Sequence, residues 1–145
     1  MVKKAMTELD VDGIRFTFAD GWSAMKWDDA DDHRLYMGKL QTDGQGSKAV
    51  DVIGLHGGSP YLFEVKDFRG PAIAIANLYR DLPIELGFKA RDTAAGVVGA
   101  VSRGGAGLVA EWLAAVACER NAVRFVAWIA EDAHRPGEND YIKVQ

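Results

Sequence analysis

Three charged residues near the middle of the chain have the types and the spacing to bind a metal ion. Asp51 is followed, after twelve intervening residues, by Glu64, Val65 and Lys66. Side chains alternate between the two faces of a β-strand, so we expect Glu64 and Lys66 on one face and Val65 in the core. If Asp51 lies on a partner strand, two carboxylates and one ammonium group meet in a small patch.

Such a patch has a defined chemical use. Two carboxylates, together with a backbone carbonyl and water molecules, can hold Mg²⁺, which prefers oxygen ligands and keeps several of its waters. The ion can polarise a phosphate oxygen and lower the pKa of a bound water, and a nearby lysine can stabilise negative charge on phosphorus. The alternative for an isolated Glu-x-Lys pair is a salt bridge on a solvated strand face.

Two β-rich runs must bring these residues together. Residues 49–55 and 61–66 are rich in aliphatic and aromatic side chains, and the sequence His-Gly-Gly-Ser-Pro at 56–60 lies between them. Two such runs joined by a short turn that contains Gly and Pro predict an antiparallel hairpin. The hairpin is therefore the element that would position the candidate site.

The residues before the hairpin predict two strands and a helix. Alternating apolar and polar residues predict strands at 13–18 and 22–27. The acidic run 28–32 suits the start of a helix that reaches about residue 40, because carboxylates favour the positive end of the helix dipole. Residues 1–12 are polar, and we expect them to be flexible.

The residues after the hairpin predict helices and then strands. Proline suits a first helical position, so Pro83 is expected to interrupt one helix and begin another. The predicted segments are helices at 72–82, 84–102 and 108–120, a buried strand at 123–129 and a short strand at 141–144. This order predicts one α/β (α+β) domain over residues 1–145, with a mixed central sheet flanked by helices.

The hairpin also resembles the core of a known enzyme family. Residues 48–53 (KAVDVI) and 61–67 (YLFEVKD) resemble the PD-(D/E)XK nuclease superfamily, in which a hairpin carries an Asp, then a Glu or Asp, one apolar residue and a Lys. The resemblance covers about twenty residues. It implies a restriction-endonuclease-like fold and a metal-dependent nuclease that hydrolyses phosphodiester bonds of DNA or RNA.

The resemblance also implies roles for individual residues. Asp51 and Glu64 would be metal ligands, the Val65 backbone carbonyl would be a third ligand, and Lys66 would be the catalytic lysine. The implied cofactor is Mg²⁺, with Mn²⁺ as a substitute. Fold-level resemblance alone does not establish activity, so a catalytically silent, protein-binding member of the same fold is the alternative. A plain α/β domain in which Glu64 and Lys66 form a salt bridge is a third possibility.

The chain departs from the family pattern at two places. Val50 precedes Asp51 where the family name has proline, and this position varies in the family. The first helix of the family usually offers a glutamate, but residues 33–41 contain no acid. Asp28, at the end of a predicted strand, is the favoured substitute as a metal ligand. For most of the acidic run 28–32, a solvated helix cap is the expected role.

Basic residues after the hairpin are candidates for contact with nucleic acid. Arg69, Lys89 and Arg91 could bind phosphates, although solubility on exposed helix faces is the simpler role for each. The net charge of −4 argues against a protein that coats nucleic acid. It does not exclude a nuclease, because metal ligands make the metal-free site acidic. At 145 residues, sequence specificity would require a homodimer or a partner protein.

The remaining features predict an ordinary intracellular domain. Cys118 is the one cysteine, so no intrachain disulfide can form, and we expect a buried, inert thiol. The four tryptophans are expected in the core. The N-terminus lacks the apolar run of a signal peptide, and the apolar stretches are too short to span a bilayer. We therefore expect a cytoplasmic protein with no membrane contact.

Overall fold

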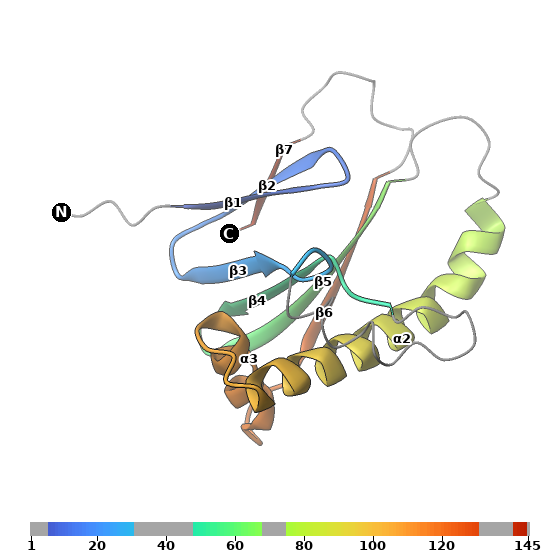
Figure 1. Cartoon of the computed structure of the whole chain (residues 1–145). Helices are drawn as coiled ribbons and strands as arrows, with labels where there is room; N and C mark the ends of the chain where they lie inside the picture. Colours follow the sequence, from blue (N-terminus) through green and yellow to red (C-terminus); the bar gives the residue numbers. More distant parts are fainter. Residues whose placement is uncertain (1–5, 31–47, 68–74, 131–140, 145) are drawn as a thin grey trace.

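The computed structural model describes residues 6–30, 48–67, 75–130 and 141–144 (Figure 1). Within these ranges the chain forms strands and helices in a mixed α+β arrangement. The strands are β1 (Thr7–Val11), β2 (Ile14–Phe18), β3 (Trp22–Lys26), β4 (Val52–His56), β5 (Ser59–Asp67), β6 (Arg124–Ala130) and β7 (Tyr141–Val144). The helices are α2 (Ile75–Ser102) and α3 (Leu108–Ala117).

The strands form two sheets. The larger sheet has the order β3-β4-β5-β6, in which β3, β4 and β5 are mutually antiparallel and β6 is parallel to β5. The smaller sheet has the order β1-β2-β7, with β7 parallel to β2. The predicted mixed sheet with helices packed on it is confirmed for the larger sheet, whereas the separate small sheet was not predicted.

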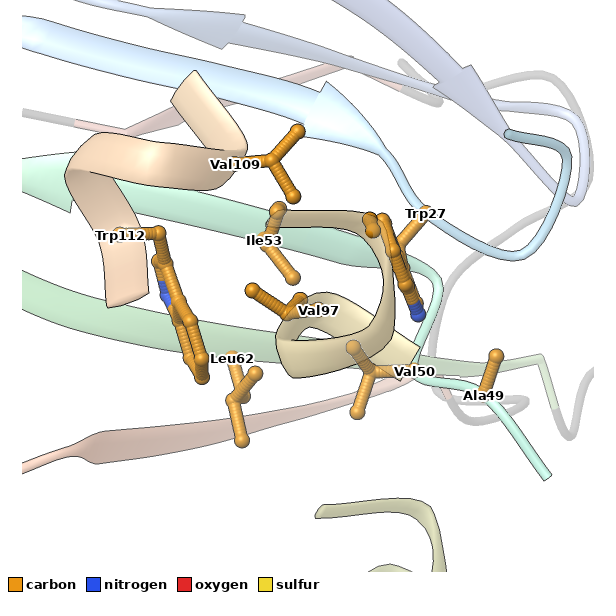
Figure 2. Packing of buried hydrophobic residues seen from close by; sticks show 9 residues of the cluster. Trp27, Ala49, Val50, Ile53, Leu62, Val97, Val109 and Trp112 are labelled. Atoms are coloured by element: carbon orange, nitrogen blue, oxygen red, sulfur yellow. The ribbon is translucent and has the colours of Figure 1, made fainter. Parts of the chain in front are cut away.

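The larger sheet lies between the helices and the smaller sheet (Figure 1). On its helical side, Ile53 and Leu62 pack with Val97 of α2 and with Val109 and Trp112 of α3 (Figure 2). The cluster on its other side contains Val11, Ile14, Phe16, Phe18, Val52, Phe63 and Val65. Strand β5 is therefore covered on both faces, and any charged side chain on it must find a partner.

The predicted hairpin is confirmed as β4 and β5. Gly57 and Gly58 have φ angles of 56° and 79°, a left-handed conformation that glycine adopts without steric cost, and His56 pairs with Ser59 across the turn. Strand β4 begins later than the predicted residue 49. The backbone N–H groups of Lys48 and Val50 instead donate to the side chains of Asp92 and Thr93 on α2.

The N-terminal segment is more ordered than its composition predicts. The predicted flexibility of residues 1–12 is wrong for Thr7–Val11, which forms β1 and pairs antiparallel with β2. Val11 is buried in the same cluster as Ile14. Pairing with a neighbouring strand outweighs the low hydrophobicity of this segment, because strand preference depends strongly on tertiary context.

Proline 83 does not divide the helical region. The prediction of two helices is wrong here, since α2 is continuous from Ile75 to Ser102 with Pro83 inside it. Proline removes one helical hydrogen bond, but buried residues before and after it, Leu82 and Val97, belong to the same helix. The predicted break after residue 102 is confirmed, and Gly104, with φ of 93°, lies in it.

Three side chains are more exposed than predicted. Strand β6 lies at the edge of the larger sheet, and Trp128 on it is 41 % exposed although a core position was expected. Trp22 is only partly buried, whereas Trp27 and Trp112 are core residues as predicted. Cys118 is exposed, and the expected buried thiol is wrong because α3 ends at Ala117.

The helix expected to start in the acidic run 28–32 and to reach about residue 40 lies outside the described residues from residue 31 onward, and residues 28 and 29 form a turn. Arg69 also lies outside the described residues. Among the helices of the described ranges, none combines the length and apolar character needed to cross a membrane.

Candidate metal site at the end of the hairpin

Asp51 lies one residue before β4, at the end of the hairpin away from the glycine turn. Its carboxylate oxygen Oδ2 accepts a hydrogen bond from the backbone N–H of Val65, with an N···O distance of 2.7 Å. Its backbone carbonyl accepts a hydrogen bond from the N–H of Trp27 at 2.8 Å. Asp51 is thus held by two hydrogen bonds, one from β5 and one from Trp27, the residue that follows β3.

The carboxyl group of Asp51 is in an unfavourable place for a negative charge. Burial raises its pKa from the ordinary value of 3.8 to about 6, the hydrogen bond from Val65 opposes this shift, and the charge of Glu64 adds to it. Asp51 is 7 % exposed, so water does little to stabilise its ionised form. A cation bound next to Asp51 would favour that form.

Glu64 is more deeply buried and is only half satisfied. It is 1 % exposed. Its Oε1 atom accepts a hydrogen bond from Lys89 Nζ at 2.6 Å and lies 3.1 Å from Lys66 Nζ. Its Oε2 atom is buried and has no hydrogen-bond partner within the part of the chain that the structure describes. A buried polar atom without a partner is rare and costs free energy, so Oε2 is an available ligand atom.

Helix α2 contributes two further charges to the site. Glu85 and Lys89 lie four residues apart, and Glu85 Oε1 accepts a hydrogen bond from Lys66 Nζ at 2.8 Å. The four side chains therefore form an alternating series, Glu85–Lys66–Glu64–Lys89, in which each contact joins opposite charges. The series connects α2 to the face of β5 that also carries Leu62.

The charge state of Lys66 follows from these contacts. Burial alone lowers the pKa of its ammonium group, but the hydrogen bond to Glu85 and the charge of Glu64 outweigh burial and raise the pKa above 10.5. The same contact with Lys66 lowers the pKa of Glu85 below 4.5. Lys66 is therefore a stable cation at neutral pH, which suits it to stabilise negative charge rather than to accept a proton.

The structure brings together the four residues to which the resemblance assigns the main roles, namely Asp51, Glu64, Val65 and Lys66. Glu64 and Lys66 share one face of β5, while Val65 is buried on the other. Asp28 follows β3, and burial together with the charges of Asp29 and Asp51 raises its pKa. Asp28 is thus close enough to Asp51 for their charges to interact.

The predicted phosphate-binding residues have different surroundings. Lys89 lies inside the site, paired with Glu64. Arg91 has an exposed side chain that pairs with Asp92 at 2.9 Å and lies over the ring of Phe88, 4.9 Å from its centroid. Glu85 was not identified from the sequence. Its spacing to Lys89 is a signal for one helix face, but nothing local indicates that this face contacts β5.

The side chains of the site offer few donor atoms to the metal ion that the resemblance implies. No three His, Cys, Asp or Glu side chains of the described ranges lie close enough to one another to hold a metal ion. The expected set is smaller, with two carboxylates, one backbone carbonyl and waters. The unpartnered Oε2 of Glu64 and the poorly solvated carboxyl of Asp51 fit such a set.

Comparisons with known proteins add no further identification. No family model, no curated protein and no solved structure matches the chain. The geometry of the site and the short resemblance in the hairpin are therefore the features that bear on function.

Proposed function

We propose that this chain is a Mg²⁺-dependent nuclease domain of the PD-(D/E)XK type, which hydrolyses phosphodiester bonds of DNA or RNA. The observation that carries the proposal is the 2.7 Å hydrogen bond from the Val65 N–H to Asp51 Oδ2. This bond holds the first acidic residue of the motif beside the Glu-Val-Lys segment that completes it. In the proposal, Asp51, Glu64 and the Val65 carbonyl hold Mg²⁺ or Mn²⁺.

Each residue has a distinct part in the proposed reaction. A bound divalent ion would polarise a phosphate oxygen and lower the pKa of a bound water molecule. Lys66, kept protonated by Glu85 and Glu64, directs its positive charge to the negative charge that develops on phosphorus. The Val65 N–H orients Asp51, so the residue that offers its carbonyl also positions the first carboxylate.

The arrangement of the elements supports the restriction-endonuclease-like fold that the resemblance implies. The hairpin of β4 and β5 is followed by α2 and α3 and then by β6, parallel to β5. A parallel neighbour requires a crossover connection, and helices commonly provide it. The candidate site lies where β5 meets the crossover helix α2.

A second function is favoured by a different observation. Three apolar side chains of α2 are exposed, namely Ile84, Phe88 and Val98 at 62 %, 45 % and 47 %. Their spacings of four and ten residues put them on one helix face. In addition, the lysines already balance Glu64 without a metal. These features suit a catalytically silent domain of the same fold that binds a protein partner or a second copy of itself.

A metal titration separates the two functions. For the nuclease, calorimetry is expected to detect Mn²⁺ binding in the micromolar to millimolar range, and Asp51→Asn and Glu64→Gln are expected to abolish it. Lys66→Met is expected to retain Mn²⁺ binding but to lower cleavage of DNA or RNA by at least about a hundredfold. Arg15→Gln, which removes one positive charge from an exposed pair between β2 and Asp10 of β1, is the control.

Two results would contradict the nuclease. One is the absence of Mn²⁺ binding by the unaltered protein at millimolar concentration. The other is cleavage of single- or double-stranded DNA or RNA that does not depend on Asp51 and Glu64. With neither metal binding nor cleavage, the protein-binding module becomes the better proposal.

A further inference from the structure

We infer that Lys89 is an internal counter-cation that competes with the divalent metal ion for Glu64 and so sets the metal affinity of the site. This inference rests on the proposed function, because it takes Glu64 as a metal ligand. It assigns to Lys89 a role that neither the motif nor its spacing contains.

The contact distances distinguish the two lysines that meet Glu64. Lys66 Nζ lies 2.8 Å from Glu85 Oε1 and 3.1 Å from Glu64 Oε1, so it is shared between two carboxylates. Lys89 Nζ makes the shorter contact with Glu64, at 2.6 Å. Because Lys66 retains Glu85 as a partner, Lys89 is the cation whose removal leaves Glu64 least compensated.

The charges of the site lead to the same assignment. Glu85, Lys66, Glu64 and Lys89 form direct ion pairs in which two carboxylates face two ammonium groups. A divalent ion bound to Glu64 would place a second cation beside the ammonium group of Lys89, and the two would repel each other in a place where charge is poorly screened. Without Lys89, Glu64 keeps only the ammonium group of Lys66, which it shares with Glu85.

The position of Lys89 permits a metal ion to displace its ammonium group from Glu64. Its side chain is 14 % exposed, against 1 % for Glu64, so the lysine reaches solvent where the carboxylate does not. Lysine has a flexible four-carbon stem, and the group can turn to solvent while α2 stays in place. Once displaced, Lys89 is a free cation beside the metal site, where it can bind a phosphate of the substrate.

The test is the Mn²⁺ affinity of the full chain, measured by calorimetry and by electron paramagnetic resonance of free Mn²⁺. Lys89→Met is expected to bind Mn²⁺ about tenfold more tightly than the unaltered protein, because a nearby positive charge has been removed. Lys89→Arg, which keeps the charge, and Arg15→Gln, which removes a distant one, are expected to stay within about twofold. Equal or weaker binding by Lys89→Met would overturn the inference.

Thermal unfolding provides a second readout that needs no catalysis. Without Mn²⁺, Lys89→Met is expected to unfold at a lower temperature, because the buried Glu64 loses the nearer of its two cationic partners. With Mn²⁺, its unfolding temperature is expected to rise more than that of the unaltered protein. The double variant Glu64→Gln/Lys89→Met removes both buried charges and is expected to fold without responding to Mn²⁺.

The outcomes separate this inference from the proposed function. If the unaltered protein and Lys89→Met both fail to bind Mn²⁺, the metal site itself is wrong, and the inference falls with it. If the unaltered protein binds Mn²⁺ and Lys89→Met binds no better, the metal site stands and the competition is wrong. A Lys89→Met protein that folds only with Mn²⁺ supports the inference, whereas one that stays unfolded with millimolar Mn²⁺ contradicts it.

Discussion

The two ends of the β4–β5 hairpin are built from different interactions. At the turn, His56 stacks on Trp22 with their ring centroids 4.7 Å apart, and Trp22 also contacts Tyr61 at 4.7 Å. At the opposite end lie the buried carboxyl groups of Asp51 and Glu64 and the partly buried ammonium group of Lys66. The turn end is stabilised by aromatic contacts, whereas the other end buries charges.

The aromatic end of the hairpin contributes stability, whereas the charged end costs stability. Aromatic pairs stabilise a fold beyond their buried area. A buried carboxylate with one unpartnered oxygen, together with an aspartate whose pKa is raised to about 6, costs stability. Perturbed pKa values and unsatisfied polar groups cluster at functional sites. The end that is less favourable for folding is therefore the end that carries the proposed metal site.

The largest expected effect on stability lies at the turn end. Trp22→Ala removes the ring that contacts His56, Tyr61 and Phe63, and is expected to lower the free energy of unfolding by about 3 kcal/mol. Urea denaturation measures this loss. Mn²⁺ affinity is expected to stay unchanged when the variant is folded. A loss of Mn²⁺ binding in folded Trp22→Ala would show that the two ends are not independent.

At the charged end, a substitution is expected to raise the free energy of unfolding instead of lowering it. Asp51→Asn keeps an oxygen for the Val65 N–H but removes the buried charge, so the free energy of unfolding at pH 7 is expected to rise by about 1 to 3 kcal/mol. The same change is expected to abolish Mn²⁺ binding in the proposed site. A variant that is less stable at pH 7 would mean that the Asp51 charge holds the fold together.

The pH dependence of this effect follows from the raised pKa. Below about pH 3.8 Asp51 is protonated in both the folded and the unfolded chain, and its burial carries no charge penalty. Between pH 3.8 and about 6 the unfolded chain loses the proton first, so this group lowers folding stability as the pH rises. The stability difference between Asp51→Asn and the unaltered protein is expected to grow over this interval and then to level off.

A smaller effect on the free energy of unfolding is expected when the contact between Glu85 and Lys66 is removed. The lowered pKa of Glu85 means that its ion pair contributes stability above about pH 4.5, and that this contribution is lost as the pH falls through the folded pKa. Glu85 is one-third exposed, so Glu85→Gln is expected to cost no more than about 1 kcal/mol at pH 7. Chemical denaturation at pH 7 and at pH 3 measures the difference, and an equal loss at both would contradict an electrostatic cause.

Local patterns predicted the elements that hold the site. The alternation along residues 61–66 and the glycine turn at 57–58 were sufficient for the hairpin, because both depend on neighbours within a few residues. The same alternation placed Glu64 and Lys66 on one face, and their 3.1 Å contact agrees with it. Strand β1 was missed because its residues are mostly polar, although its partner β2 begins only three residues further along the chain. The continuity of α2 through Pro83 was missed because proline is typical of a first helical position.

By itself, the sequence determined the charged residues of the hairpin and their alternation, since a strand's period of two is a property of the backbone. Only the tertiary structure decided that α2 lies against β5, so that Glu85 and Lys89 join Lys66 and Glu64. It also decided that Glu64 Oε2 is buried without a partner. Burial depends on which distant element covers a face, and no short-range pattern in the chain encodes that choice.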